Sequence, residues 1–287
     1  MLWLDAICQQ ALSAKAIADL FLLIGDKTQA DEWQSKYLAK KQLVNSLYWD
    51  EKEQFYFDID CNDYTPYKVR TIASYWALTS KIATQEQAKK MISCLLDEKD
   101  FGGQFPLVSL SRKDADFEEL GRYWRGSIWL PTAYATLKGV ANYGYYQEAQ
   151  LLAHNLFKHM LKTYQDYEPH TIWECYSPTD NKPAKQTNNK SDVRPNFCGW
   201  SALGPISIYL EYVLGFHSIN AFDKIVEWKK PNTFVGKVGV KNLRFGNVVT
   251  DIIADDDNCI VMSNEDYTLK INGIALAIKK GKNIFKM

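Results

Sequence analysis

The sequence predicts a mainly α-helical protein that ends in a small antiparallel β domain. Two observations carry this prediction. Apolar residues recur at helical spacing through the first two-thirds of the chain, whereas short β-branched runs separated by Gly, Asn and Asp turn signals follow Gly215. The 287 residues suffice for one large domain with a smaller one. We therefore expect a helical domain over residues 1–217 and a β-sandwich-like domain over 218–287.

The helical part contains about seven amphipathic segments. Between them, residues 48–58 have alternating aromatics typical of a short hairpin or an extended loop. Two polar stretches, 98–123 and 166–198, are long for loops inside a helical domain, and loops of this length usually carry function. The expected helices span residues 4–24, 29–47, 69–81, 85–96, 128–143, 146–164 and 199–214.

The β part is read from its β-branched runs and from the turn residues between them. Three consecutive aspartates, Asp255–Asp257, lack the spacing of a calcium loop and are interpreted as a solvated turn. The expected strands include residues 225–226, 235–240, 247–253, 260–262, 267–271 and 274–278.

Charge and composition exclude several classes of protein. With 34 basic and 34 acidic residues, the chain lacks the basic surface of a nucleic-acid or membrane-surface binder. No run of 18 apolar residues predicts a membrane span, and the start lacks a basic signal-peptide region, so we expect a cytoplasmic protein as the chain stands. The six cysteines form no CxxC pair, and no dinucleotide or phosphate-loop motif occurs. We therefore expect no metal and no cofactor.

Aromatic residues make up 14% of the chain, and many of them gather in three short stretches: 121–129, 171–179 and 195–203. Three of the six arginines, Arg122, Arg125 and Arg194, fall in or beside these stretches. Aromatic faces next to directed polar groups suit a sugar ring. Glu174 lies among the aromatics and can act there as a general base or a nucleophile. The alternative is a solvated loop glutamate beside core aromatics.

The same stretches resemble the (α/α)6-barrel, or six-hairpin, glycosidases. YWRGSIW at 123–129 resembles the YWRGP(I/V)W signature of a group that includes the family 63 processing α-glucosidases, the mannosylglycerate hydrolases and, more distantly, the trehalases. The loop from Phe105 to Phe117 resembles the family's P-x-S…D-(D/P)-x-F loop. WECYSPT at 173–179 and FCGWS at 197–201 resemble its W-E-x-Y-x-P-x-T-G and F-x-G-W-(S/T) motifs, in the family's order.

The resemblance implies an inverting glycosidase that acts on an oligosaccharide or a small α-glycoside, without nucleic acid, membrane or cofactor. Glu174 matches the family's general base. Arg125 is expected to orient Glu174 or a sugar hydroxyl, whereas Trp129 is assigned to the core. The expected substrate-binding residues are Tyr123, Trp124, Arg125, Gly126, Trp173, Tyr176, Trp200 and Gln104.

The sequence departs from the family pattern in two ways. Ser127 replaces the usual proline, Val108 stands where a proline commonly precedes the serine, and Asp180 replaces a common glycine, which leaves the sugar specificity open. The family's general acid is an aspartate in a G-(W/M)-D-x-S loop, and no such segment is present. Residues 2–25 resemble the helix that follows this loop.

These departures predict a partial (α/α)6 toroid, because about seven of its twelve helices are expected here. The chain would then carry the base half of the site and need a missing N-terminal half, or associate with itself. The alternatives are a carbohydrate-binding or partner-dependent protein without catalysis of its own, and a different (α/α) toroid enzyme such as an epimerase or lyase.

Overall fold

The structure is a computed structural model that describes residues 1–187, 191–232 and 234–287. Residues 188–190, inside the second expected long loop, therefore lie outside the described residues. The chain divides into two compact units, Met1–Gly204 and Pro205–Met287. The division falls earlier than residue 217 because the last long helix groups with the strands that follow it rather than with the helical unit.

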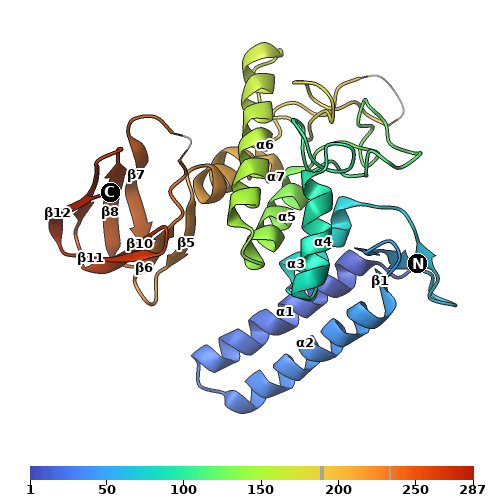
Figure 1. Cartoon of the computed structure of the whole chain (residues 1–287), viewed down its shortest axis with the longest axis horizontal. Helices are drawn as coiled ribbons and strands as arrows, with labels where there is room; N and C mark the ends of the chain where they lie inside the picture. Colours follow the sequence, from blue (N-terminus) through green and yellow to red (C-terminus); the bar gives the residue numbers. More distant parts are fainter. Residues whose placement is uncertain (188–190, 233) are drawn as a thin grey trace. The chain divides into compact units, whose positions relative to one another are not determined.

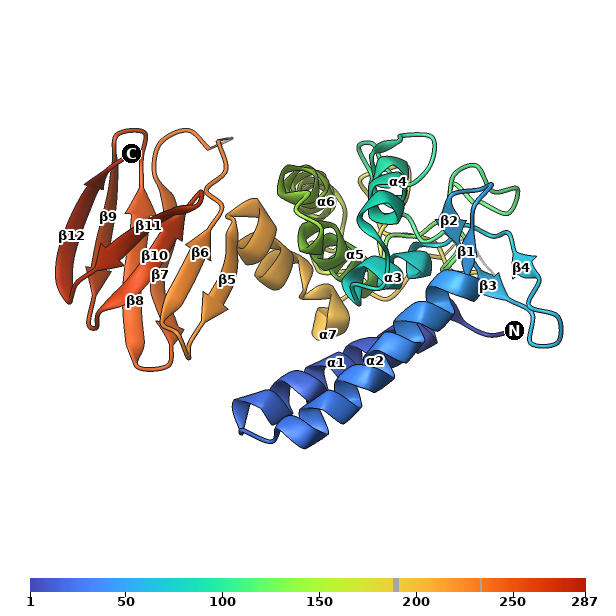
Figure 2. The same ribbon diagram turned by 60° about the horizontal axis from the view of Figure 1, so that its bottom comes forward.

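The helical unit begins with an antiparallel hairpin of α1 (Leu4–Leu23) and α2 (Lys27–Leu47), which lie side by side (Figures 1 and 2). The side chain of Asp26 accepts a hydrogen bond from the Gln29 backbone and caps α2. Two short strand pairs follow: β1 (Trp49–Asp50) with β2 (Phe55–Tyr56), and β3 (Asp58–Ile59) with β4 (Pro66–Tyr67). The hairpin expected over 48–58 is thus confirmed at β1–β2. The remaining helices of this unit are η1 (Ile72–Tyr75), α3 (Trp76–Thr79), α4 (Gln85–Leu96), α5 (Leu130–Asn142), α6 (Tyr146–Asp166) and α7 (Cys198–Ser201).

Most predicted helices are confirmed, but two differ from the prediction. The segment 69–81 forms only a 3₁₀ turn and one α-turn, because Thr71 is drawn into an extended bridge with Leu110. The segment 199–214 is broken into α7 and a π-helix, η2 (Gly204–Val213). Gly199 takes a non-helical conformation, and Pro205 has no N–H with which to continue the α-helical ladder.

Close packing joins the central helices of the unit. A β-carbon on Gly139 of α5 would lie 2.9 Å from the β-carbon of Leu78 on α3. The Thr79 hydroxyl donates to the Ala135 carbonyl oxygen at 2.8 Å, so polar groups at this contact are also paired. Glycine thus allows the two helices to approach each other more closely than any other residue would.

Helix α1 is long and apolar enough to cross a membrane by length and composition alone, with 22% of its apolar window buried. The helix contains no run of 18 consecutive apolar residues, because charged residues interrupt it. Asp5, Lys15 and Asp19 lie on this helix. Its buried side chains follow a helical stripe that faces α2 and α3, as in a helix of a packed bundle.

The second unit contains two four-stranded sheets packed around a common apolar core, in which Phe216 and Trp228 stack at 4.8 Å. The strand orders are β11-β10-β6-β5 and β12-β9-β8-β7 (Figure 2). The strands are β5 (Phe216–Asn220), β6 (Ile225–Trp228), β7 (Val238–Phe245), β8 (Val248–Ala254), β9 (Asn258–Ser263), β10 (Tyr267–Ile271), β11 (Ile274–Ile278) and β12 (Gly281–Lys286).

Two features of this unit differ from the sequence prediction. Strands β5 and β12 were not expected, because both are sheet edges whose polar residues interrupt the β-branched pattern. The expected purely antiparallel arrangement is wrong at one place, since β6 and β10 pair in parallel. The chain between these strands forms β7, β8 and β9 of the other sheet, so β10 returns beside β6 in the same direction.

Candidate active site

The two long loops of the helical unit meet and hold each other. Ile128 and Tyr176 exchange backbone hydrogen bonds of 2.9 and 3.0 Å, which places the first aromatic stretch against the second. The half-buried Arg112 guanidinium donates to the carbonyl oxygens of Phe105 and Pro178, at 2.6 and 3.2 Å. The loops are therefore a fixed scaffold built from paired polar groups.

Glu174 lies in this scaffold with only 4% of its surface exposed. Its backbone N–H donates to the Arg194 carbonyl oxygen at 3.0 Å. Its own carbonyl oxygen accepts hydrogen bonds from the Trp200 indole at 3.1 Å and the Ser201 hydroxyl at 3.0 Å. The FCGWS stretch thus fixes the backbone of Glu174.

The carboxylate of Glu174 faces a tyrosine and an arginine. The Tyr123 hydroxyl lies 3.3 Å from both carboxylate oxygens, and Arg194 Nε lies 4.0 Å from one of them. Burial, followed by the charge of Glu174, raises the pKa of Tyr123, so this hydroxyl stays protonated and donates. A carboxylate with these neighbours retains lone pairs that can accept a proton from water.

The backbone that presents Tyr123 is unusual. Gly121, Arg122, Tyr123 and Gly126 have positive φ angles of 83°, 36°, 63° and 141°. A β-carbon on Gly126 would lie 2.8 Å from the Phe117 ring, so no other residue fits there without a shift. Backbone conformations of this kind concentrate at functional sites.

Exposed indoles border the site. Trp124 stacks on Trp129 at 4.4 Å with an interplanar angle of 10°, and Trp129 lies 6.0 Å from Trp200. Trp124 and Trp200 are 54% and 42% exposed, whereas Trp129 is 3% exposed, as expected of a core residue. Two accessible indoles on a buried one form an apolar platform of the kind that a sugar ring covers.

The structure places the other predicted substrate-binding residues in different surroundings. Trp173 and Tyr176 are 2% and 1% exposed, so they pack inside the scaffold rather than as open aromatic walls. Arg125 pairs with Asp116 at 2.9 Å and is not the arginine beside Glu174. Gln104 lines a pocket on α6 to which Glu174 does not contribute.

Arg194 is the residue whose role the sequence did not assign. The sequence did contain an indication that Arg194 belongs to the site, because it is one of six arginines and lies at the edge of an aromatic stretch. Position in sequence alone does not separate it from Arg125, which lies in the stronger motif. Only the fold brings residue 194 back against residue 174, through the backbone pairing of these two residues.

Comparisons with known proteins show the family to which the chain belongs. The family model of the mannosylglycerate hydrolase MGH1-like glycoside hydrolase domain matches residues 7–191, more than half of the chain. An uncharacterized protein of Borreliella burgdorferi is 27% identical over 253 residues, covering 86% of this chain and 52% of its own length. The cytosolic neutral trehalase of Kluyveromyces lactis is 24% identical over 221 residues, covering 76% of this chain and 29% of the enzyme.

Solved structures show the same fold. A mannosylglycerate hydrolase of glycoside hydrolase family 63 from Thermus thermophilus, in complex with glucose, superposes with a TM-score of 0.57 at 21% identity, covering 72% of this chain and 44% of that one. A protein described as a sialidase superposes with a TM-score of 0.67 at 17% identity, covering 95% of this chain and 24% of that one. The chain thus spans about half or less of the length of these proteins.

The fold and the family model place the chain in the class of glycoside hydrolase domains. More particularly, the chain belongs to the mannosylglycerate hydrolase MGH1-like glycoside hydrolase family.

Proposed function

We propose that Glu174 is the general base of an inverting glycosidase that acts on an α-linked hexoside. The observation that carries this proposal is the buried carboxylate of Glu174, whose backbone is fixed by Trp200 and Ser201 and which lies beside the Tyr123 hydroxyl. The exposed indoles of Trp124 and Trp200 supply the apolar face for the sugar. The motif order of the sequence supports the same assignment.

The proposed reaction is a single displacement. Water bonds to the anomeric carbon while the carboxylate of Glu174 takes its proton, and the glycosidic carbon–oxygen bond breaks on the opposite face. The leaving oxygen takes a proton from a carboxylic acid. We place this acid outside the present sequence, in the part of the family's proteins that the chain does not span.

We also propose that the helical unit is part of an (α/α)6 toroid whose other helices cover α1. The end of α1 supports this, because Leu20, Leu22, Leu23 and Ile24 are 56–75% exposed. Apolar surface of this extent is usually covered by a partner. The expected partner is the other part of the toroid or, in its absence, a second copy of the chain.

A substrate whose leaving group needs no proton isolates the role of Glu174. An α-glycosyl fluoride releases fluoride without acid assistance, so the chain alone should hydrolyse the fluoride and leave the corresponding alkyl glycoside intact. Glu174→Gln should lower fluoride hydrolysis by about 10²–10⁴-fold, the usual contribution of a general base. Proton NMR of the first product should show the β anomer, which reports inversion.

A neighbouring carboxylate provides the matched control. Asp116→Asn makes the same chemical change at an exposed residue that pairs with Arg125 instead of facing Glu174, and it should leave the rate within about twofold. Equal losses in both variants, or an α-anomeric product, would contradict the assignment. Turnover of the alkyl glycoside by the chain alone would show that the acid lies within this sequence.

The second candidate function is sugar binding without catalysis, which the two exposed indoles favour. Quenching of tryptophan fluorescence by an α-glucoside, with no fluoride release, would support it. Trp124→Ala should then weaken sugar binding, while Glu174→Gln should leave it unchanged.

A further inference from the structure

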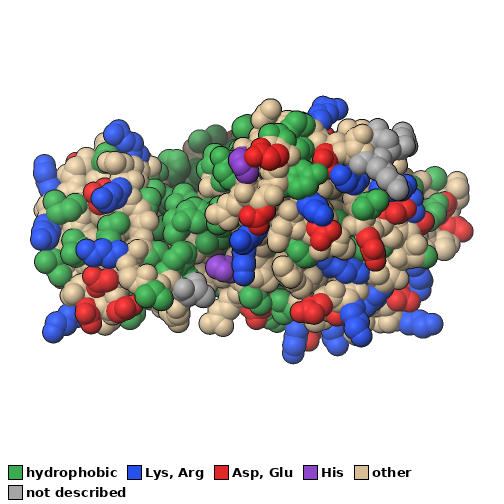
Figure 3. Space-filling view, turned by 90° about the horizontal axis from the view of Figure 1, so that it is seen from above, with side chains coloured by type: hydrophobic (Ala, Val, Ile, Leu, Met, Phe, Trp, Pro, Cys, Tyr) green, Lys and Arg blue, Asp and Glu red, His purple; other side chains and the backbone are tan. Residues whose placement is uncertain are grey.

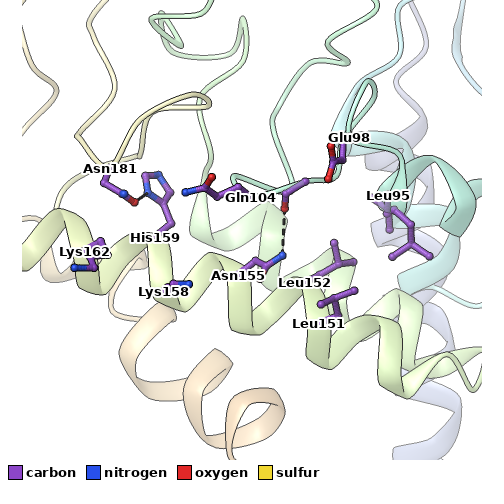
Figure 4. A pocket seen from close by; sticks show the side chains of 12 residues that line it. Leu95, Glu98, Gln104, Leu151, Leu152, Asn155, Lys158, His159, Lys162 and Asn181 are labelled. Atoms are coloured by element: carbon purple, nitrogen blue, oxygen red, sulfur yellow. Dashed lines mark hydrogen bonds between the residues drawn. The ribbon is translucent and has the colours of Figure 1, made fainter. Parts of the chain in front are cut away.

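We propose that a second cavity in the helical unit binds a small amphiphilic carboxylate, that is, a carboxylate group joined to a short aliphatic chain. The cavity has a volume of about 540 Å³, which suits a small ligand (Figure 4). It lies between α4, α6 and the two long loops, and neither Glu174 nor its contacts line it. Its lining comprises Leu95, Leu96, Glu98, Gly103, Gln104, Leu151, Leu152, Asn155, Lys158, His159, Lys162 and Asn181.

One end of the cavity is apolar. Leu95 and Leu152 are buried, whereas Leu96 and Leu151 are 40% and 54% exposed although both line the cavity. These leucines come from two helices, α4 and α6. An aliphatic chain between them would remove both exposed side chains from water.

The other end of the cavity carries positive charge. Lys158 and Lys162 lie one turn apart on α6, and the nearest anion to Lys162 is Asp166 at 3.8 Å. Within the described residues, Lys158 forms no ion pair. The one carboxylate of the lining, Glu98, lies toward Leu95, at the apolar end (Figure 4). The lysines therefore favour an anionic group away from the leucines.

The polar lining favours a carboxylate over a sugar. Burial lowers the pKa of His159 to about 4, so its ring is neutral near pH 7 and adds no charge. The amide of Gln104 offers a directed hydrogen bond to a second oxygen, and Asn155, whose Nδ2 donates to the Gly103 carbonyl oxygen at 3.2 Å, has a second N–H to offer. No Trp, Tyr or Phe belongs to the lining described for this cavity, so it lacks the flat apolar surface that Trp124 and Trp200 provide at the other site.

The cavity also touches the loop that carries Glu174. His159 Nε2 donates to the carbonyl oxygen of Ser177 at 3.0 Å, and its Nδ1 lies 3.2 Å from Oδ1 of Asn181. Gln104 brings the other long loop to the same place. A ligand here would contact α6 and both loops at once, which is the position of an effector rather than of a substrate.

Calorimetric titration of the full chain with octanoate tests this inference. Acetate keeps the charge and lacks the chain, whereas 1-octanol keeps the chain and lacks the charge. Octanoate should bind at least about tenfold more tightly than either. The double substitution Lys158→Gln/Lys162→Gln and the single substitution Leu151→Ser should each weaken octanoate binding about tenfold or more.

Lys89→Gln is the control for the loss of a lysine ammonium, because it removes one positive charge from an exposed position of α4 outside the cavity. It should leave binding unchanged. In ¹H–¹⁵N spectra, octanoate should shift the backbone amides of Asn155, His159 and Ser177. Absence of octanoate binding, equal binding of 1-octanol, or an equal loss in Lys89→Gln would overturn the proposal. None of these results depends on glycoside hydrolysis, so the inference and the proposed catalytic role fail separately.

Discussion

The two long loops and the α1–α2 hairpin of the helical unit bury their residues in opposite ways. The loops have little regular structure, yet every residue of 107–111 and 173–178 is buried. The hairpin is regular throughout, yet Leu20, Leu22, Leu23 and Ile24 at its end are more than half exposed. Regular secondary structure and burial are therefore separate properties in this molecule.

The difference has a physical cause. An irregular backbone can be buried only when side chains and neighbouring strands satisfy its polar groups. Arg112 donates to carbonyl oxygens of Asp100, Gly102, Phe105 and Pro178, which does this for both loops. A helix satisfies its own backbone, so α1 needs tertiary partners only for its apolar side chains. On the face seen in Figure 3, acidic and basic side chains are interspersed without a large area of one sign.

The largest effect is expected when the pairing of the loops is broken. Arg112→Met would leave the carbonyl oxygens of Gly102, Phe105 and Pro178 without this donor, whereas Asp100 would keep the backbone N–H of residue 112. It should lower the free energy of unfolding by about 3–5 kcal/mol. Arg125→Met removes an arginine whose side chain is 44% exposed and pairs with the exposed Asp116, and it should cost at most about 1 kcal/mol. Urea unfolding followed by tryptophan fluorescence reports on this unit, since eight of the nine tryptophans lie in it. Similar losses in the two variants would show that Arg112, with its guanidinium on loop carbonyl oxygens, contributes no more than an arginine whose side chain pairs with an exposed aspartate.

The next largest effect is expected in the pH dependence of the unfolding free energy. It arises from His159, through which the helix α6 contacts the loop of Glu174. Burial lowers the pKa of His159 from 6.5 to about 4, so the unfolded chain binds the proton more readily than the folded one. The contribution of His159 to the free energy of unfolding is therefore fully present above about pH 6.5. It decreases by on the order of 3 kcal/mol as the pH falls to about 4.

His159→Gln should flatten the pH dependence of the unfolding free energy over this range, because glutamine does not titrate. The matched control is His154→Gln, an exposed position of the same helix, which should leave the pH profile as it is. Unchanged profiles in both variants would show that His159 is not the group responsible.

A smaller effect is expected from the backbone of the first loop. Gly126→Ala places a β-carbon 2.8 Å from Phe117 and 3.0 Å from the Glu118 carbonyl oxygen, at a φ of 141°. It should lower the free energy of unfolding by about 1–3 kcal/mol. Gly144→Ala also has a positive φ but meets no atom within 4 Å, so thermal unfolding should show a smaller loss there. An equal loss would mean that φ alone, rather than close packing, requires glycine at 126.

The smallest stability effect is expected at the end of the hairpin. Leu22→Ser and Leu23→Ser replace exposed side chains and should change the free energy of unfolding by no more than about 0.5 kcal/mol. Their effect should appear in association, because they remove part of an apolar surface that another chain can cover. Sedimentation should show self-association of the unsubstituted chain that is reduced in both variants. A stable monomer before substitution would contradict an uncovered toroid face.

Local patterns predicted the elements whose signals are strong in the sequence. Helical spacing predicted α1, α2, α4, α5 and α6 within a few residues, and the β-branched runs predicted β6 to β11. Strands β5 and β12 were not predicted because polar residues interrupt their apolar pattern, whereas the other two edge strands, β7 and β11, contain the predicted runs. The π-helix was not predicted, because the apolar spacing of 199–214 does not show which carbonyl oxygens accept its backbone hydrogen bonds.

The candidate site shows the same limit. The order of four motifs predicted Glu174, Trp124 and Trp200 as site residues, and the structure shows that the two indoles are exposed. It did not separate exposed aromatics from Trp173 and Tyr176, which are buried. Residue type reports the ability to bind a sugar, whereas exposure depends on what the rest of the chain places over the ring.

The sequence by itself determined the family, the helical and β parts, and the carboxylate at residue 174, because motifs and periodicity are local properties. Only the tertiary structure decided that Arg194 rather than Arg125 faces Glu174, that Gln104 belongs to the cavity on α6, and that β10 returns parallel to β6. These are contacts between residues far apart in the chain. They depend on the path of the loops, and no local spacing encodes that path.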